Sequence, residues 1–366
     1  MDSTTAECPA ALPCATSSSG SADIGVDISV VIPVHNGAPF FADCLESVLA
    51  QQLDFLNERE AGVSVEVSIF DDASVDCSFE VAASFEKAFR SKGFRFTLGR
   101  SGSGRPGGVG FGKNRAVRQS AGRFLCFLDA DDTMAPQRLK LQFVLAVRSR
   151  RRALKQPLAY FMVYTSNGPT VVAPTWFCSR ALFDEVGGFV EAEGPFAEDL
   201  AFFYEALRLG ARVLRVDEEL VTYRYHADCA SHSVSEDVIW NLRLAELERN
   251  VLSRAEWSTF SIWNAGKQGR KLFWSLSPER RDCVAAFCDV DPKKIAAGVY
   301  QRFAEVSSSR GGVRRVAENR PVPIVAVVDV APPVVVCVKL DMTGGCFEQL
   351  LRDKHWVEDG DYVLFG

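Results

Sequence analysis

The amino-acid sequence predicts an α/β fold with a parallel sheet and, after it, a smaller α/β unit. Three observations support this class: strand-like and helix-like segments alternate from residue 28 onward, the strand-like segments are continuously apolar, and polar residues follow them directly. Continuous apolar strands are typical of a sheet covered by helices on both faces, and strand–helix alternation favours parallel strands. A chain of 366 residues is long enough for two domains.

The first half supplies the sheet elements in order. The apolar runs 28–35 and 65–70 predict buried strands, and residues 39–52 between them carry apolar side chains spaced for one helical face. The next predicted elements are a helix over 78–93, a strand over 94–99, a glycine-rich loop, a helix over 112–122 and a strand over 123–128. Ligands of parallel sheets bind at the carboxyl ends of the strands. The polar stretches 33–36, 71–76 and 129–132 are therefore expected at one edge.

The rest of the chain is predicted to be mixed. Its expected elements are a helix over 138–155, a strand and short helix within 167–189, a helix over 198–210, strands within 211–226 and a long helix over 236–257. A second unit then reads strand, glycine turn, helix, strand and helix over 260–295, with apolar strands at 321–327 and 332–340. Residues 306–321, rich in serine, glycine and arginine, are predicted to form a loop or flexible linker.

The composition limits the cellular compartments and the classes of partner that are expected for this protein. The net charge of −6 provides no general basic field. The eleven cysteines are scattered without a C-x-x-C pair, which disfavours a zinc ribbon and favours a reducing compartment. Residues 1–25 lack the basic and apolar regions of a signal peptide and are predicted to be a disordered tail. No apolar run reaches the ~18–20 residues of a membrane span, so a cytoplasmic or nuclear protein without membrane attachment is expected.

Three carboxylates crowd the end of the strand over 123–128. Asp129, Asp131 and Asp132 lie within four positions, and carboxylates packed this closely repel one another unless a cation neutralises them. Mg²⁺ and Mn²⁺ prefer such hard oxygen ligands, often together with substrate phosphates. Asp131 is therefore predicted to be a metal ligand. Asp132 has an alternative interpretation, as the N-cap of the following helix.

Five ordered motifs carry a family resemblance. They are V-V-I-P-V-H-N-G at 30–37, S-I-F-D-D-A-S-V-D at 68–76, G-V-G-F-G-K-N-R-A-V at 108–117, F-L-D-A-D-D at 127–132 and P-F-A-E-D-L-A-F-F-Y-E-A-L at 195–207. Together, over residues 28 to about 232, they resemble the family 2 glycosyltransferases of the GT-A fold. The resemblance implies transfer of a sugar, with inversion, from a nucleotide-sugar donor, usually a UDP-sugar, with a divalent metal such as Mn²⁺ or Mg²⁺.

The resemblance also implies roles for particular residues. On the donor side, it implies that the loop residues Pro33, His35 and Asn36 line the nucleotide and that Asp71, or preferably Asp72, hydrogen-bonds the uracil. Lys113 and Asn114 are implied to lie near the nucleotide. Asp129 is implied to reach the ribose, and Asp131 to hold the metal. Asp199 is implied as the general base that takes the acceptor's hydroxyl proton. The alternative for Asp199 is an acid placed at a helix start, where the macrodipole favours negative charge.

Three further positions carry weaker expectations. His226 matches a position where related enzymes often place a metal ligand, but a lone histidine is as readily a satisfied surface or core residue. Trp176 and Glu198 follow the acceptor-side segments of the family. Trp176 is expected either to stack on an acceptor ring or to pack in the core.

A closer resemblance extends over nearly the whole chain after residue 28. The segments 165–183, 260–276, 284–295 and 336–345 resemble the queuosine-tRNA galactosyltransferases, earlier described as N-acetylglucosaminyltransferase-like. This implies UDP-galactose as donor, a tRNA acceptor, a catalytic domain over 26–256 and a Rossmann-like domain over 257–366. Basic residues gather at 148–155, 267–281 and 310–315. They are interpreted either as a phosphate-binding face or as solvated helix ends.

Other interpretations stay open. The glycine turn at 264–269 followed by Asp289 indicates a degenerate nucleotide-binding fold that serves structure or tRNA docking, or else binds a nucleotide or phosphate. A nicotinamide-dependent oxidoreductase is the weakest interpretation. The chain is otherwise expected to glycosylate a glycan, lipid or protein, or to be an inactive binding module. The 32 residues at 133–164 are fewer than the family commonly carries there. This segment is interpreted either as a genuine shortening or as a mis-predicted gene model, and either would affect the acceptor site and the catalytic sheet.

Overall fold

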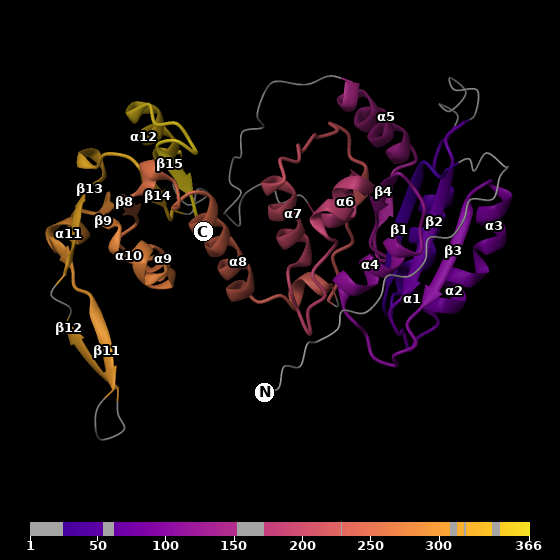
Figure 1. Cartoon of the computed structure of the whole chain (residues 1–366), viewed down its shortest axis with the longest axis horizontal. Helices are drawn as coiled ribbons and strands as arrows, with labels where there is room; N and C mark the ends of the chain where they lie inside the picture. Colours follow the sequence, from indigo (N-terminus) through magenta and orange to yellow (C-terminus); the bar gives the residue numbers. More distant parts are fainter. Residues whose placement is uncertain are drawn as a thin grey trace, which may run out of the picture.

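The computed structural model describes residues 25–53, 62–151, 172–227, 229–307, 313–317, 320–338 and 345–366. It shows two α/β units in one chain, each with its own mainly parallel sheet (Figure 1). The predicted fold class is therefore confirmed. Residues 1–24 of the predicted N-terminal tail and residues 152–164 of the short 133–164 segment lie outside the described residues.

The first sheet has the strand order β3-β2-β1-β4-β6. Its strands are β1 (Ile28–Val34), β2 (Val65–Asp71), β3 (Arg95–Arg100), β4 (Phe124–Phe127) and β6 (Phe177–Ser179). The first four pair in parallel, and β6 is antiparallel to β4. All seven residues of β2 and six of the seven of β1 are buried. Continuous apolar runs thus form central strands, as the sequence predicts.

Helices cover both faces of this sheet. They are α1 (Ala38–Leu49), α2 (Ser78–Ser84), α3 (Glu86–Ser91), α4 (Val109–Arg118), α5 (Arg138–Arg151), α6 (Arg180–Val186) and α7 (Glu198–Arg208). Because side chains alternate along a strand, Val30 and Ile32 pack with Phe41 of α1, whereas Val31 packs with Val117 of α4 on the other face. Val34 lies opposite Asp71 in register, so β1 and β2 end at one edge.

Three local expectations were wrong. The helix predicted over 78–93 is divided at Phe85 into α2 and α3. Residues 211–226 contain only the short strand β7 (Val221–Thr222), which pairs with β5 (Thr133–Met134). The predicted linker contributes to an antiparallel pair, β11 (Phe303–Ser307) with β12 (Val313–Ala317). Its sequence has valines on both sides of a Ser/Gly stretch, a pattern that is also typical of a hairpin.

The second sheet has the order β10-β13-β9-β8-β14-β15 and is parallel except at β10. Its strands are β8 (Phe260–Trp263), β9 (Val284–Asp289), β10 (Val299–Tyr300), β13 (Val322–Ala326), β14 (Val334–Val336) and β15 (Tyr362–Leu364). Its helices are α9 (Lys267–Ser275), α10 (Pro278–Asp282), α11 (Pro292–Ala296) and α12 (Cys346–Lys354). The strand, turn, helix and strand predicted from residue 260 onward are confirmed.

The long helix α8 (Glu236–Asn250) lies between the two sheets in Figure 1. It contacts α7 of the first unit. However, it buries Trp240, Leu244 and Leu247 in the core of the second unit. Although α8 precedes the predicted boundary at residue 257, its apolar face therefore stabilises the C-terminal sheet. None of the described helices is both long and apolar enough to cross a bilayer.

Candidate functional site

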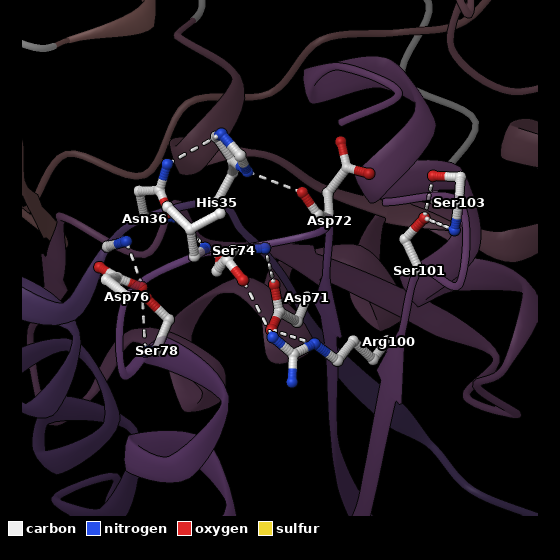
Figure 2. Close-up of polar contacts among 12 residues, drawn as sticks. His35, Asn36, Asp71, Asp72, Ser74, Asp76, Ser78, Arg100, Ser101 and Ser103 are labelled. Carbon is white, nitrogen blue, oxygen red and sulfur yellow. Dashed lines mark hydrogen bonds and ion pairs between the residues drawn. The ribbon is translucent and has the colours of Figure 1, made fainter. Parts of the chain in front are cut away.

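Hydrogen bonds link the loops after β1 and β2 at the carboxyl edge of the first sheet (Figure 2). The backbone N–H of Asn36 donates to Ser74 Oγ at 2.9 Å, and Asn36 Oδ1 accepts from the N–H of Val75 at 2.9 Å. His35 Nδ1 lies 2.7 Å from the carbonyl oxygen of Asp72. Asn36 has a φ of 51°, in the left-handed region that asparagine tolerates better than most residues. His35 and Asn36 are exposed, so they are available at this edge.

The two adjacent aspartates after β2 have different partners. Asp71 is fully buried: its Oδ1 accepts from the N–H of Ser74 at 2.8 Å, and its Oδ2 lies 3.3 Å from Nε of Arg100. Asp72 is 3% exposed and accepts from the N–H groups of Gly107 and Gly108 at 2.8 to 2.9 Å. Asp72 therefore anchors the glycine-rich loop. If Asp72 also bonds the uracil, as predicted, the same carboxylate must accept hydrogen bonds from both the uracil and this loop.

Lys113 is the buried centre of the site. Its Nζ lies 3.0 Å from Oε1 of Glu198 and 3.9 Å from Oδ1 of Asp129. Lys113 comes from α4, Asp129 from the loop after β4, and Glu198 from the first turn of α7. The structure thus brings two expected donor-side residues together with Glu198, the neighbour of the expected base. Glu198 forms an ion pair with the buried ammonium group of Lys113, and its expected role on the acceptor side stays a prediction.

Burial and charge shift the pKa values of this cluster. Burial raises the pKa of Asp199 above its ordinary value, although the Lys113 ammonium opposes the rise. Burial likewise raises the pKa of Asp129, again against the effect of Lys113. Burial by itself would lower the pKa of Lys113, but Asp129, Glu198 and Asp199 together raise it well above its ordinary value. A raised pKa is typical of a carboxyl group that exchanges protons during catalysis.

Glycines allow α4 to approach the elements that carry these carboxylates. A Cβ at Gly110 would lie 2.3 Å from the carbonyl oxygen of Val190, and one at Gly112 would lie 3.1 Å from Cβ of Pro33. Asn114, on the same helix, donates to the carbonyl oxygen of Phe189 and accepts from its N–H. Asn114, expected near the nucleotide, therefore fixes the loop that leads into α7, and Pro33 packs against α4.

A second cluster joins the D-A-D-D loop to the segment after β7. His226 Nε2 lies 2.9 Å from Oδ2 of Asp131, and the Sγ of Cys229 lies within 4.8 Å of both ligand atoms. The His226 ring packs against Phe40 of α1, with centroids 4.7 Å apart. Carboxylate, imidazole and thiol are all metal ligands, so this donor set fits a divalent cation. Sequence reasoning did not identify Cys229, although the H-x-x-C spacing at 226–229 was a possible signal.

Asp132 is not a helix cap. It is fully buried, and its Oδ1 accepts from the N–H of Arg224 at 2.8 Å, while α5 begins only at Arg138. The capping alternative was therefore wrong, because the chain turns back toward β7 before the helix starts. Arg138, which the sequence did not single out, is also fully buried and donates to the carbonyl oxygen of Phe127 at 2.8 Å. It holds α5 against the end of β4.

The buried carboxyl of Asp132 predicts a pH-dependent stability. Burial raises its pKa to about 7, and Asp129 and Asp131 add to the rise. Since the unfolded state releases this proton near pH 4, the folded state should lose stability relative to the unfolded state as the pH rises from about 4 to about 7. Asp132→Asn removes this ionisation. We expect the variant to gain a few kcal/mol over wild type between pH 5 and pH 8, measured by urea unfolding in chelator.

The comparison between the two proteins isolates residue 132, because every other titrating group is shared. Parallel stability curves for wild type and Asp132→Asn across this range would contradict the buried, raised carboxyl. Chelator is needed because a cation at the neighbouring Asp131 would relieve the same repulsion.

Trp176 lies within an aromatic cluster. Its ring centroid is 5.5 Å from that of Phe202 and 6.2 Å from that of Phe189, and the residue is half-buried against the core shared by α4, α6 and α7. These contacts favour the core-packing alternative over stacking on an acceptor.

The turn after β8 is closed by internal contacts. Asp289 Oδ2 accepts from the N–H of Ala265 and from Nζ of Lys294, both at 2.9 Å. A Cβ at Gly269 would lie 1.8 Å from the carbonyl oxygen of Asn264, so this glycine allows α9 to pack against the end of β8. The glycine of the predicted nucleotide turn therefore serves helix packing.

Comparison with known proteins gives one family match. Residues 29–163 match the family model of glycosyl transferase family 2. The match covers β1 to β5 and the D-A-D-D loop, and it ends before Asp199. It agrees with the motif resemblance for this part of the chain and with the α/β sheet that carries it.

Individual relatives are distant. The chain is 23% identical over 224 residues to the uncharacterized glycosyltransferase EpsJ of Bacillus subtilis, which covers 54% of this chain and 60% of the relative. It is 27% identical over 112 residues to the poly(ribitol-phosphate) β-N-acetylglucosaminyltransferase TarS of Staphylococcus aureus, over 31% of this chain and 17% of the relative. The crystal structure of S. aureus TarS 1–349 with UDP-GlcNAc aligns with a TM-score of 0.47 and 20% identity, over 69% of this chain and 71% of that one.

Proposed function

We propose that this chain, whose residues 29–163 match glycosyl transferase family 2, is a glycosyltransferase that moves a sugar from a nucleotide-sugar, in the first place a UDP-sugar, to an acceptor hydroxyl with inversion. The observation that carries the proposal is the placement of Lys113 between Asp129 and Glu198. It joins the D-A-D-D loop, expected on the donor side, to the start of α7, where the expected base lies. The whole-chain activity is a proposal, since the chain spans 60% or less of the curated relatives described above.

Asp199 is assigned the role of general base. Its carboxylate takes the proton of the acceptor hydroxyl as that oxygen attacks the anomeric carbon, and the bond between that carbon and the diphosphate oxygen breaks. Attack from the face opposite the leaving group inverts the anomeric centre. The raised pKa of Asp199 makes it a stronger base than an exposed aspartate. The Lys113 ammonium opposes this rise in the pKa of Asp199.

Asp131 and His226 are assigned to a divalent cation, Mn²⁺ or Mg²⁺. When bound, such a cation supplies positive charge that offsets the diphosphate of the departing nucleotide. The His226 ring packs against the ring of Phe40. The Cζ atom of Arg224 lies 4.7 Å from the centroid of the Phe40 ring. His35 and Asn36 are assigned to the nucleotide because they are exposed at the edge where the strands end.

The first candidate acceptor is a hydroxyl of a glycan or polyol-phosphate chain. The names of the relatives support this class, since one is a poly(ribitol-phosphate) β-N-acetylglucosaminyltransferase and another, from Rhizobium meliloti, is a succinoglycan biosynthesis protein. The latter is 31% identical over 114 residues, or 31% of this chain and 28% of the relative.

The second candidate acceptor is queuosine in tRNA, with UDP-galactose as donor. It is favoured by the motifs at 260–276, 284–295 and 336–345, which lie outside the family match and resemble the queuosine-tRNA galactosyltransferases. The basic residues of 267–281 give this reading little support. Lys271 pairs with Asp237 at 3.1 Å, and Arg281 donates to carbonyl oxygens of α9 and Leu276. The groups at 148–155 and 310–315 fall largely outside the side chains that the structure describes.

One experiment tests donor and acceptor together. The purified chain is incubated with Mn²⁺, a panel of UDP-sugars, and either poly(ribitol phosphate), succinoglycan-type oligosaccharides or queuosine-containing tRNA. We expect release of UDP to depend on one acceptor class and to stop in the presence of chelator. A mass increase of the acceptor by one hexose or N-acetylhexosamine identifies the sugar. Absence of UDP release and of UDP binding across the panel would overturn the proposal and leave the inactive binding module.

A further inference from the structure

The donor set around Asp131 contains a sulfur atom that neither the family resemblance nor the sequence motifs implied. Asp131 comes from the loop after β4, whereas His226 and Cys229 come from the segment after β7. One ligand atom from each lies within 4.8 Å of the others. Three ligands from two loops, with His226 and Cys229 only three positions apart, match the way protein metal sites are built.

Hydrogen bonds to the backbone fix the position of the Cys229 sulfur beside His226. Its Sγ accepts from the backbone N–H of His226 at 3.2 Å and donates to the carbonyl oxygen of Arg224 at 3.4 Å. Its own N–H donates to the carbonyl oxygen of His226 at 3.2 Å, which closes the turn between the two ligands.

Two of the three side chains are partly exposed to solvent. Cys229 is 4% exposed and forms the inner wall. The side chains of His226 and Asp131 are 19% and 29% exposed and form the rim. Ligand atoms of a tetrahedral site with bonds of about 2.0–2.3 Å lie about 3.3–3.8 Å apart. The three ligand atoms here lie within 4.8 Å of one another, and His226 Nε2 and Asp131 Oδ2 lie 2.9 Å apart, so we expect their positions to adjust when a metal binds.

The three donors differ in the metals that they favour. Carboxylate oxygen suits Mg²⁺ and Mn²⁺, imidazole suits Zn²⁺ and other later transition metals, and thiolate favours Zn²⁺ strongly over Mg²⁺ or Mn²⁺. Three protein ligands of mixed type with a fourth position left open are typical of zinc sites that also bind a substrate oxygen. A site that needed only Mn²⁺ or Mg²⁺ would gain little from sulfur.

We propose that Cys229 is a third metal ligand and that it gives the Asp131–His226–Cys229 site a preference for Zn²⁺ or Co²⁺ over Mn²⁺ and Mg²⁺. The proposal deepens the proposed function, because it concerns the same metal position. On binding, the Cys229 thiol forms the sulfur–metal bond and releases its proton to solvent, and the proton between His226 Nε2 and Asp131 Oδ2 leaves that position so that both atoms can ligate the metal. The carbonyl oxygen of Arg224 loses the S–H donor, whereas the backbone N–H of His226 still donates to the sulfur. Zinc affinity should therefore rise with pH.

The test measures metal binding by the full-length chain, freed of metal by chelator. Titration of wild type with Co²⁺ should produce the near-ultraviolet thiolate-to-cobalt charge-transfer band, saturate at a single ion per chain, and be reversed by Zn²⁺. In Cys229→Ser the band should be absent, and Zn²⁺ should bind at least about tenfold more weakly, whereas Mn²⁺ binding should change much less. Cys77→Ser is the matched control, since Cys77 is an exposed thiol remote in sequence from the cluster, and it should keep the band.

X-ray absorption of zinc-loaded wild type tests the same ligand without any variant, and should show sulfur at about 2.3 Å from zinc. A wild-type chain without the band, a band that survives Cys229→Ser, or a zinc shell without sulfur would each overturn the proposal. Turnover of UDP-sugars with Mn²⁺ but no sulfur in the zinc shell would reject Cys229 as a ligand and leave the transferase function standing. Sulfur in the zinc shell without binding or turnover of UDP-sugars would support the metal site and reject the transferase.

Discussion

Replacing Asp199 by asparagine is expected to lower kcat for sugar transfer by about 10²- to 10⁴-fold, the usual worth of a positioned general base. Asparagine keeps the shape of the side chain and an oxygen that can accept from the N–H of Leu200, as Oδ1 of Asp199 does at 2.7 Å. It cannot take up the acceptor's proton. The measurement is the rate of UDP release at saturating donor and acceptor, with UDP binding measured in parallel to show that the donor site is intact.

The pH profile gives the same assignment a second test. Because the base acts in its ionised form and burial raises its pKa, wild-type activity should fall as the pH drops through that raised pKa. Asp184→Asn is the matched control: this aspartate lies on α6 and is exposed, so turnover should equal that of wild type. Unchanged turnover in Asp199→Asn would remove Asp199 from the mechanism.

Replacing Lys113 by methionine is expected to cost about 3–5 kcal/mol in the free energy of unfolding, the usual cost of removing one partner of a buried ion pair. Lys113 is 2% exposed, and its Nζ lies 3.0 Å from Oε1 of Glu198. Methionine fills similar space but leaves the carboxylates without their cation. Lys271→Met is the control, since the more exposed pair with Asp237 should contribute at most about 1 kcal/mol. Urea unfolding at neutral pH measures both.

The charge of Lys113 also controls the proposed base. Without the ammonium, which lowers the pKa of Asp199, that pKa should rise further, and the acidic limb of the pH–rate profile should move to higher pH. Replacing both partners, Lys113→Met with Glu198→Gln, should restore part of the lost stability, because the buried charge is then removed with its partner. A loss in Lys113→Met no greater than that in Lys271→Met would show that the cluster does not need its cation.

Some of these features could be predicted from residue order, because they depend on local patterns. The continuous apolar runs of β1 and β2 require burial on both faces, and this fixes a sheet between two helical layers. Parallel strands in turn bring the polar loops after β1, β2 and β4 to one edge. Predictions from local patterns were wrong where a pattern fits two structures, as in residues 303–317, whose valines and glycines are typical of both linkers and hairpins.

The sequence by itself determined the α/β class, the strand ends on which the site is built and the carboxylates that the D-A-D-D loop contributes. Only the tertiary structure decided which of those side chains meet. Lys113 pairs with Glu198 across 85 positions, His226 reaches Asp131 across 95, and Asp72 turns to the glycine-rich loop. Periodicity reports which face of an element is buried, but partners so distant in the chain are selected by how helices and loops pack. The sulfur of Cys229 lies beside Asp131 for the same reason.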